Sequence, residues 1–302
     1  MQNICILCGT NNYAQKLYES NVRDEDLNER VFSARRLPDR LHGTILRCKK
    51  CGLVYASPLI DTATLADLYK TSAYTYSGEE TYIKKTYARY LARLANELNV
   101  RKTPRTYLDI GCGNGFMLEA AKELGFQEVL GAEPSSHAIA QAADSVRGGI
   151  AQGMFSAELI GENRVDALTC FQTVDHITDP VAFVAECLRV LKPGGLALFI
   201  NHNIGSFTAR ILGERCPMID IEHTYLHTPQ TMKILFEKEG FSDIRTFAVR
   251  NDYPIHYWAH LFPGPKKIKE PLISFLKKNV VGKIVIPLYA GNLGLIAQKP
   301  NL

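Results

Sequence analysis

After residue 105, short apolar runs alternate along the chain with longer amphipathic segments. Runs such as "TYLDIG", "EVLGAEP" and "VDALTCFQ" are typical of buried strands. The segments of about ten residues between such runs predict helices, which we expect over residues 116–124, 135–144, 180–191 and 228–239. Because strands separated by helices pair in parallel, the pattern predicts an α/β fold with a doubly wound, mostly parallel sheet.

Two shorter zones precede this alternation. Residues 1–58 hold two close cysteine pairs and a charged middle. Residues 59–105 favour a helical linker or lid, because apolar side chains recur there at helical spacing. These side chains are Ile83, Tyr87, Tyr90, Leu91, Leu94 and Leu98. We therefore expect an N-terminal module over 1–58, a linker over 59–105 and a main domain over 106–302. In the linker, Tyr74 and Tyr76 either form part of a lid over the cofactor or acceptor or pack within a helix.

Composition and charge are those of an ordinary globular protein. Of the 302 residues, 46% are hydrophobic and 22% are charged, and 35 basic against 31 acidic residues give a net charge of +4. This excess favours acidic small molecules or nucleic acid only weakly, and it does not indicate an oligomeric state. The sequence has neither a signal-peptide pattern nor an uncharged apolar run of about 18 residues, so we expect a cytoplasmic protein without a membrane span.

The stretch "LDIGCGNG" joins the first strand of the main domain to its first helix. Gly111, Gly113 and Gly115 allow the backbone to turn tightly and approach a ligand at the carboxyl edge of the sheet. A dinucleotide site would require its third glycine at the position of Phe116. Instead, Asp109 stands two residues before the first glycine, where a carboxylate suits a ligand with an ammonium group. S-adenosylmethionine is a ligand of this kind.

A second acid supports a nucleoside ligand. Glu133 ends the next predicted strand, 22 residues after Gly111, where a carboxylate can accept hydrogen bonds from both ribose hydroxyls. Cys112 lies inside the glycine turn, where small residues are tolerated, so we do not expect it to be a nucleophile.

Five ordered motifs resemble those of class I S-adenosylmethionine-dependent methyltransferases: "LDIGCGNG", "GAEPS", "VDHITDP", "RVLKPGG" and "HTYLHTPQTMKILFEKEGF". The resemblance covers about residues 106–300 and implies a seven-stranded sheet whose last strand, "NLGLIAQK", is antiparallel. It implies that Met154 and Phe155 contact the adenine and that Gln172 lies near the sulfonium. The full cofactor set that it implies is Asp109, Gly111, Cys112, Gly113, Gly115, Glu133, Pro134, Met154, Phe155 and Gln172.

The two cysteine pairs predict a metal site. "CILCG" and "CKKCG" are C-x-x-C turns followed by glycine, so Cys5, Cys8, Cys48 and Cys51 can hold one structural Zn²⁺ through four thiolates. The 39 residues between the pairs exceed the spacing of roughly 15 to 20 in compact zinc ribbons. We therefore expect a zinc ribbon with an insertion at residues 21–40. "RCKKCGLVYASP" also resembles N-terminal zinc modules fused to methyltransferases of bacterial sugar, glycan and natural-product pathways.

Methyl transfer to oxygen or carbon also requires removal of a proton, for which histidine is the usual base. His176 is the first candidate, because the loop "TVDHITDP" leaves the carboxyl edge of the sheet beside the expected transfer site. His223 is the second candidate, and His202 and His227 are alternatives.

These observations predict a methyltransferase that acts on a small molecule, with a sugar or another hydroxylated metabolite as the acceptor. One alternative is an RNA methyltransferase whose zinc ribbon binds nucleic acid, although acids and bases mix in that module. Another is a protein that binds the cofactor without turnover. The lysine-rich segment 262–288 predicts a helix and loop between the last two strands, and association with a membrane surface or a cover over the acceptor pocket are alternatives.

Overall fold

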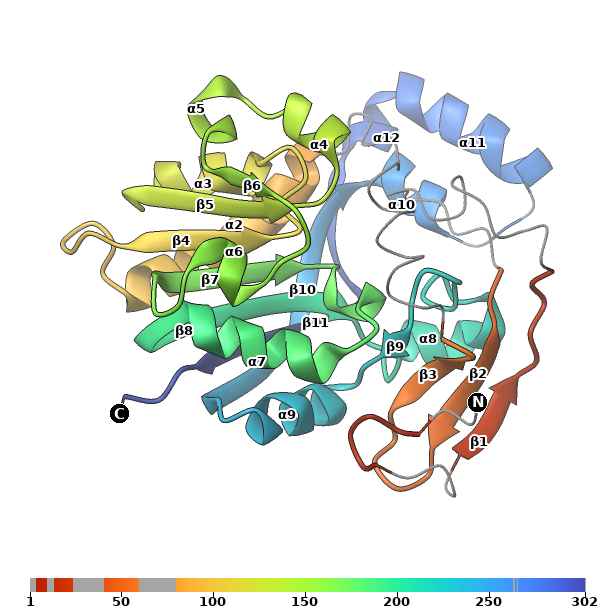
Figure 1. The fold of residues 1–302 in the computed structure, drawn as a ribbon. Helices are drawn as coiled ribbons and strands as arrows, with labels where there is room; N and C mark the ends of the chain where they lie inside the picture. The colour runs from red at the N-terminus through yellow and green to blue at the C-terminus, as the bar shows by residue number, and fades with distance from the viewer. Residues whose placement is uncertain are drawn as a thin grey trace.

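Seven strands form the main sheet of the protein (Figure 1). The computed structural model describes residues 4–9, 14–23, 41–59, 80–262, 264 and 266–301. The strand order is β10-β11-β8-β7-β4-β5-β6. The strands are β4 (Thr106–Ile110), β5 (Glu128–Glu133), β6 (Ile150–Gln152), β7 (Val165–Phe171), β8 (Leu191–His202), β10 (Ser242–Pro254) and β11 (Val285–Gln298). Strands β4 to β8 pair in parallel, whereas β11 is antiparallel to both of its neighbours. The predicted sheet and its antiparallel last strand are thus confirmed.

The sheet is buried on both faces, which explains its continuous apolar strands. Alternate side chains of β8 show this arrangement. Leu198 and Ile200 belong to the apolar cluster under one layer of helices, whereas Ala197 and Phe199 belong to the cluster under the other layer. The loops that follow the parallel strands lie at the carboxyl edge of the sheet, beyond both layers of helices.

Helices α2 (Glu80–Glu97) and α3 (Phe116–Leu124) cover one face of the sheet, and α6 (Ala157–Ile160), α7 (Pro180–Val190) and α9 (Pro229–Lys238) cover the other (Figure 1). Within the linker predicted over 59–105, the described helix α2 packs on the main sheet. The side chains at its helical spacing, such as Tyr87 and Leu91, are buried against the sheet. Residues 60–79, including Tyr74 and Tyr76, lie outside the described part of the chain.

The predicted helices 116–124, 180–191 and 228–239 are confirmed as α3, α7 and α9. The prediction for 135–144 is wrong at its end, because the chain forms two short helices, α4 (Ser136–Ala140) and α5 (Asp144–Arg147). The Arg147 guanidinium donates hydrogen bonds to the backbone carbonyls of Ala140 and Ala142, between the two helices. It thereby satisfies acceptors that a continuous helix would have paired internally.

The strands of the N-terminal module belong to a second sheet, which has four strands. Its order is β1 (Ala14–Tyr18), β2 (Thr44–Cys48), β3 (Val54–Ser57) and β9 (Tyr225–Leu226). The fourth strand thus comes from the main domain, between β8 and α9, and it packs against the module through Tyr55 and Tyr225. Of the predicted insertion over residues 21–40, residues 24–40 lie outside the described chain.

Strands β8 and β9 are joined across the carboxyl edge by α8 (Phe207–Leu212) and the 3-10 turn η3 (Gly213–Arg215), and a second turn, η2 (Val174–His176), follows β7. The predicted excursion between the last two strands is confirmed as α10 (Ile255–Leu261), α11 (Lys266–Lys278) and α12 (Val280–Lys283). None of the helices in the described ranges has the length and apolar character that crossing a membrane requires.

Candidate active site and metal centre

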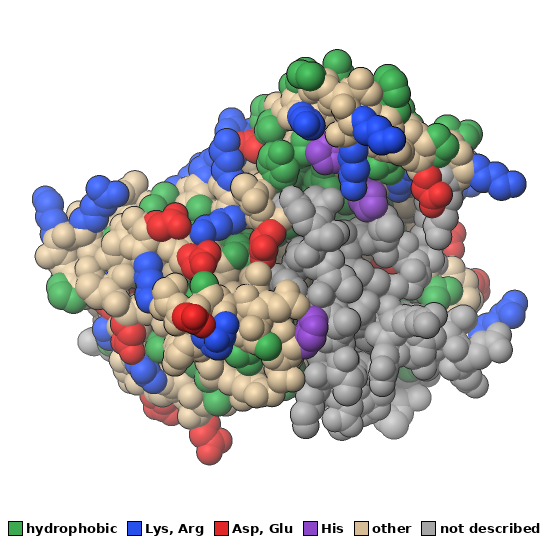
Figure 2. All heavy atoms as spheres, turned by 90° about the horizontal axis from the view of Figure 1, so that it is seen from above, with side chains coloured by type: hydrophobic (Ala, Val, Ile, Leu, Met, Phe, Trp, Pro, Cys, Tyr) green, Lys and Arg blue, Asp and Glu red, His purple; other side chains and the backbone are tan. Residues whose placement is uncertain are grey.

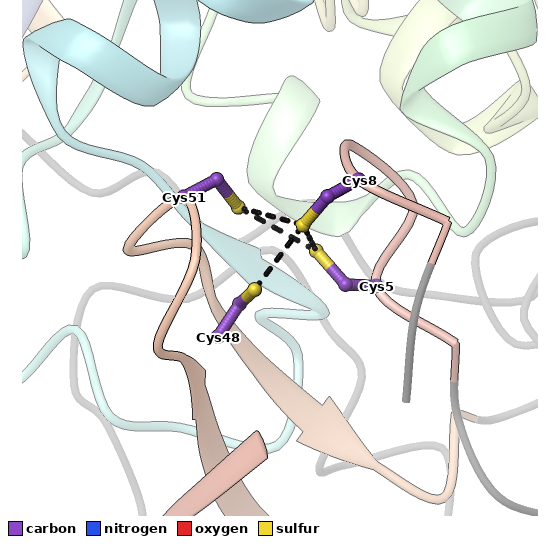
Figure 3. Close-up of side chains that lie close together, drawn as sticks. All are labelled: Cys5, Cys8, Cys48 and Cys51. Atoms are coloured by element: carbon purple, nitrogen blue, oxygen red, sulfur yellow. Dashed lines mark hydrogen bonds between the residues drawn. The ribbon is translucent and has the colours of Figure 1, made fainter. Parts of the chain in front are cut away.

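The four predicted cysteines lie together in the N-terminal module (Figure 3). The Cys8 sulfur lies 3.3, 3.2 and 3.4 Å from those of Cys5, Cys48 and Cys51, and the four sulfurs all fall within 4.8 Å of one another. Bonds of about 2.3 Å to a tetrahedral Zn²⁺ would separate the sulfurs by about 3.8 Å. The arrangement therefore fits one zinc ion after a small expansion.

The glycine turn lies where β4 meets α3. Gly111 has a φ of 72°, and a Cβ atom at this position would lie 2.7 Å from Thr173 Oγ1, so only glycine fits without a shift. Gly111 and Gly113 line the main cavity of the protein. Gly115 does not, because its Cα faces the side chains of Val146 and Ile150. Its role in the structure is close packing of α3.

Glu133 holds this turn in place from the end of β5. Its two carboxylate oxygens accept hydrogen bonds from Gly113 N at 2.8 Å and from Ser135 N at 2.9 Å. Burial raises the pKa of Glu133, and the two backbone N–H groups oppose that rise. The residue also lines the main cavity. Since each carboxylate oxygen has a second lone pair, Glu133 can still accept a bond from a ligand.

Asp109 and Cys112 line a smaller cavity of about 40 Å³, which shares the walls formed by Gly111, Gly113 and Gln172 with the main one. The Thr169 hydroxyl donates to the Asp109 carboxylate at 2.6 Å. Burial raises the pKa of Asp109 to about 7. Burial also raises the pKa of the Cys112 thiol well above its usual value. A thiol that stays protonated is a poor nucleophile, which agrees with the expectation for Cys112.

The main cavity has a volume of about 950 Å³. One half is lined by the predicted cofactor residues Pro134, Met154, Phe155 and Gln172. The Gln172 Oε1 atom is buried and has no hydrogen-bond partner among the described residues. A buried acceptor of this kind is costly unless a ligand or water satisfies it. The glycine cradle and this acceptor together fit a polar, nucleoside-bearing cofactor.

The other half of the cavity is lined mostly by residues that the sequence did not single out, although Phe262 and Leu288 belong to the segment 262–288 that was an alternative cover over the acceptor pocket. Aromatic and aliphatic side chains come from α8, β10, α10, β11 and the segments that follow η3 and α10, and they include Leu212, Met218, Tyr253, Trp258, Phe262, Leu288 and Tyr289. They come from separate loops and helices without a shared motif. Their apolar and aromatic surfaces suit an organic acceptor.

Three histidines meet between the two halves. The ring of His223 lies 4.9 Å from the ring of His176 and 4.7 Å from the ring of His202, measured between centroids, and all three line the cavity. His227 is buried and does not line it. The structure therefore brings together the two first candidates for the base and one of the two alternatives, His202.

His202 is the histidine that a buried carboxylate orients. Its Nδ1 lies 2.9 Å from Asp175 Oδ2, and its backbone N–H donates to the same oxygen at 3.0 Å. Burial alone would raise the pKa of Asp175, but the hydrogen bond and the charge of His202 hold that pKa below its usual value. With Nδ1–H donated to Asp175, the Nε2 atom of His202 can accept a proton. Asp175 belongs to the quoted motif "VDHITDP", but the sequence did not single it out.

The other cavity histidines are neutral near pH 7. Burial lowers the pKa of His176 to about 4. Burial and the neighbouring histidines hold the pKa of His223 well below its usual value, and its Nδ1 lies 2.9 Å from the backbone carbonyl of Met218. A base of such low pKa accepts a proton with little driving force, so the geometry favours His202 over His176 as the proton acceptor.

The chain is similar in sequence to known methyltransferases. A sequence-family profile described as "Methyltransferase domain" matches residues 80–246. The ubiquinone biosynthesis O-methyltransferase of Bradyrhizobium sp. (strain ORS 278) is 37% identical over 139 residues, which are 44% of this chain and 54% of that protein. The protein of the same name from Rhodopseudomonas palustris (strain HaA2) is 31% identical over 176 residues, 52% of this chain and 69% of that one.

Among solved structures, a SAM-dependent methyltransferase from Archaeoglobus fulgidus superimposes with a TM-score of 0.45 and 19% identity, covering 74% of this chain and all of that one. The chain spans about half the length of the first curated relatives that it matches.

Proposed function

The chain belongs to the methyltransferase domain family, and on that premise we propose that it transfers a methyl group from S-adenosylmethionine to a small organic acceptor. The observation that carries the proposal is the cavity of about 950 Å³, which runs from the glycine turn to the histidines. We propose an oxygen or carbon atom of a hydroxylated metabolite as the acceptor, such as a sugar, a glycan precursor or a natural-product intermediate. The names of the relatives support methylation of an oxygen on a small molecule.

In this proposal, the carboxyl edge of the sheet holds the cofactor. The backbone at Gly111 and Gly113 would lie against its methionine part, Glu133 would accept from its ribose, and Met154 and Phe155 would contact its adenine. When bound, the cofactor supplies an electrophilic methyl group on a positively charged sulfur. The Gln172 Oε1 atom carries a partial negative charge and is unpaired among the described residues, which supports placing the positively charged sulfur near it.

His202 is the proposed general base. Asp175 fixes the ring through Nδ1 and would stabilise the positive charge that forms when Nε2 takes the acceptor proton. His176 and His223 stay neutral beside it and shape the acceptor side of the cavity. Because the Nδ1–H group stays hydrogen-bonded to the buried Asp175 carboxylate, the positive charge that spreads over the ring forms beside a negative one.

The four cysteines are proposed to hold one structural Zn²⁺. The support is the close approach of the four sulfurs. Four thiolate ligands fill the coordination sphere of a tetrahedral Zn²⁺, so no position stays open for a substrate. The zinc would fix the turns at Cys5–Cys8 and Cys48–Cys51 without taking part in methyl transfer.

The first experiment is titration calorimetry with S-adenosylmethionine and with its demethylated product. Binding of both is expected, and absence of binding would refute the proposed function. The acceptor can then be sought by product mass, after incubation with a panel of sugar nucleotides and hydroxylated pathway intermediates.

The base is tested on the first acceptor found. His202→Asn is expected to lower kcat by roughly 100-fold or more with cofactor affinity unchanged. His176→Asn, the matched variant on the neighbouring ring, is expected to change kcat much less. The opposite ranking would assign the base to His176.

A further inference from the structure

An exposed apolar stripe runs along α11. Ile268, Leu272 and Phe275 follow one another at four- and three-residue steps, so their side chains share one face of the helix. They are 70, 48 and 64% exposed. The side that packs on the protein is a different one, because the buried side chain of this helix is Ile273. Exposed large apolar residues in such a row mark a contact surface.

The stripe continues beyond the helix. Val280 and Val281 are 81 and 57% exposed, and Ile284 is half-exposed. In the view from above, hydrophobic side chains and Lys or Arg side chains gather on the same lobe of the molecule (Figure 2). The apolar surface thus extends over more than one element.

The lobe carries a net positive charge. Between residues 267 and 289 the sequence has five lysines and a single acid, Glu270. The side chains of Lys267, Lys277, Lys278 and Lys283 are exposed. The whole chain, by contrast, has nearly equal numbers of basic and acidic residues. Lysines therefore concentrate where the exposed apolar residues are.

The lobe is attached firmly to the rest of the protein. The Trp258 indole N–H donates to the backbone carbonyl of Ile286 at 2.9 Å, and the His256 ring bonds the carbonyl of Gly282 at 2.8 Å. These contacts tie α10 to α12 and to the start of β11. The apolar stripe is therefore presented on a fixed support.

We propose that the α11 lobe docks on the surface of an anionic lipid bilayer. An amphipathic helix with lysines beside an apolar face lies in the plane of the interface, with the apolar side chains inserted and the lysines near the lipid phosphates. A second copy of this chain is a poorer occupant, because a symmetric contact would bring the lysines of both copies together. Anionic lipid supplies the complementary charge.

Docking would also place the cavity beside the bilayer. Phe262 and Tyr289 line the main cavity and are also 68 and 66% exposed. The cavity therefore opens at the lobe that carries the stripe. The docking itself does not depend on the proposed methyl transfer, so it can be measured without any acceptor.

The test is flotation of the full-length protein with vesicles. One set contains phosphatidylcholine alone, and the other contains equal parts of phosphatidylcholine and phosphatidylglycerol. The protein is expected to float with the anionic set at low salt, and to do so less as salt is added. The variant with Ile268→Ser, Leu272→Ser and Phe275→Ser is expected to bind at least about tenfold more weakly. These side chains are exposed, so the fold should be kept, which circular dichroism checks.

Matched variants separate the causes. Lys267→Glu with Lys277→Glu and Lys278→Glu is expected to abolish the preference for anionic vesicles. Phe207→Ser with Ile211→Ser, which removes two equally exposed apolar side chains from α8, is expected to bind as the unchanged protein does. The proposal is overturned if the unchanged protein does not float with anionic vesicles, if the α11 triple variant floats equally well, or if the α8 variant loses as much binding. It is likewise overturned if sedimentation shows a dimer that the α11 triple variant breaks.

Discussion

His227 should make the fold sensitive to acid, and His227→Gln should reduce that sensitivity. The residue is fully buried, and burial lowers the pKa of its ring from the ordinary 6.5 to about 4. Between these two values the unfolded chain binds a proton at His227 and the native protein does not. Stability therefore rises with pH in this window, and the contribution of His227 is lost as the pH falls from 6.5 toward 4.

The size of the effect follows from the difference in pKa. Each pKa unit corresponds to about 1.4 kcal/mol, so His227 costs about 3 kcal/mol of unfolding free energy across the whole window. Glutamine cannot take up this proton, although it loses part of the imidazole packing. His227→Gln should therefore be less stable than the unchanged protein near pH 7, and its deficit should shrink by about 1.4 kcal/mol for each pH unit of acidification.

Asp109→Asn provides a control of opposite sign. Burial raises the pKa of Asp109 from the ordinary 3.8 to about 7, so the native protein binds a proton that the unfolded chain does not bind in this window. The stabilising contribution of Asp109 is complete below pH 3.8 and is lost as the pH rises through about 7. Asparagine removes this dependence, so Asp109→Asn should gain stability relative to the unchanged protein as the pH rises, by up to about 4 kcal/mol.

The assay is urea unfolding at a series of pH values from above 7 down to about 5, followed by circular dichroism. Any loss of zinc in acid affects all three proteins equally, so only the differences between their curves are interpreted. Curves of unfolding free energy that run parallel for the unchanged protein and His227→Gln would refute the reasoning, as would a change of the same sign for the two variants.

Three further predictions concern the two ligand sites. Elemental analysis should find one zinc per chain, and Cys48→Ser should lose it while cofactor affinity changes little, because the glycine turn belongs to the other sheet; a metal content that the substitution leaves intact would disprove the zinc site. Glu133→Ala should weaken binding of S-adenosylmethionine by about 1.5 to 3 kcal/mol, and an unchanged calorimetric titration would exclude the ribose contact. Gly111→Ala should cost about 1 to 2 kcal/mol of unfolding free energy for its left-handed backbone, and more for its contact with the Thr173 hydroxyl. Adding Thr173→Ala should restore only the part of the unfolding free energy that the contact costs, as measured by urea unfolding. If the double variant is no more stable than Gly111→Ala, the contact is absent.

Local patterns in the sequence were sufficient for the main sheet and for the cysteine cluster. Buried parallel strands are continuous apolar runs, and the C-x-x-C turns carry their ligand spacing within four residues, so both can be found without knowledge of the fold. Strand β9 could not be found in this way. It is two residues long, too short for any periodicity, and it exists because the edge of β3 needs a partner.

The histidine that the structure favours depends on contacts distant in the sequence. Asp175 and His202 are 27 residues apart and meet because β7 and β8 pair in parallel and end at the same edge. No spacing rule predicts which of several histidines after neighbouring strands will face which carboxylate. The apolar acceptor wall has the same origin, since Met218 and Trp258 come from unrelated loops and helices. Gly111, Gly113 and Glu133 were easier to place at the cavity, because they follow consecutive strands.

The pairing of β3 with β9 has a consequence for biosynthesis. Tyr55 and its partner Tyr225 are separated by 170 positions in the sequence. During translation, the N-terminal hairpin emerges from the ribosome long before the segment that completes its sheet, and in the meantime the edge of β3 is free to pair with another nascent chain. Early metal capture by the cysteines would hold the hairpin in register during this wait. Zinc supply during synthesis should therefore influence the yield of correctly folded protein.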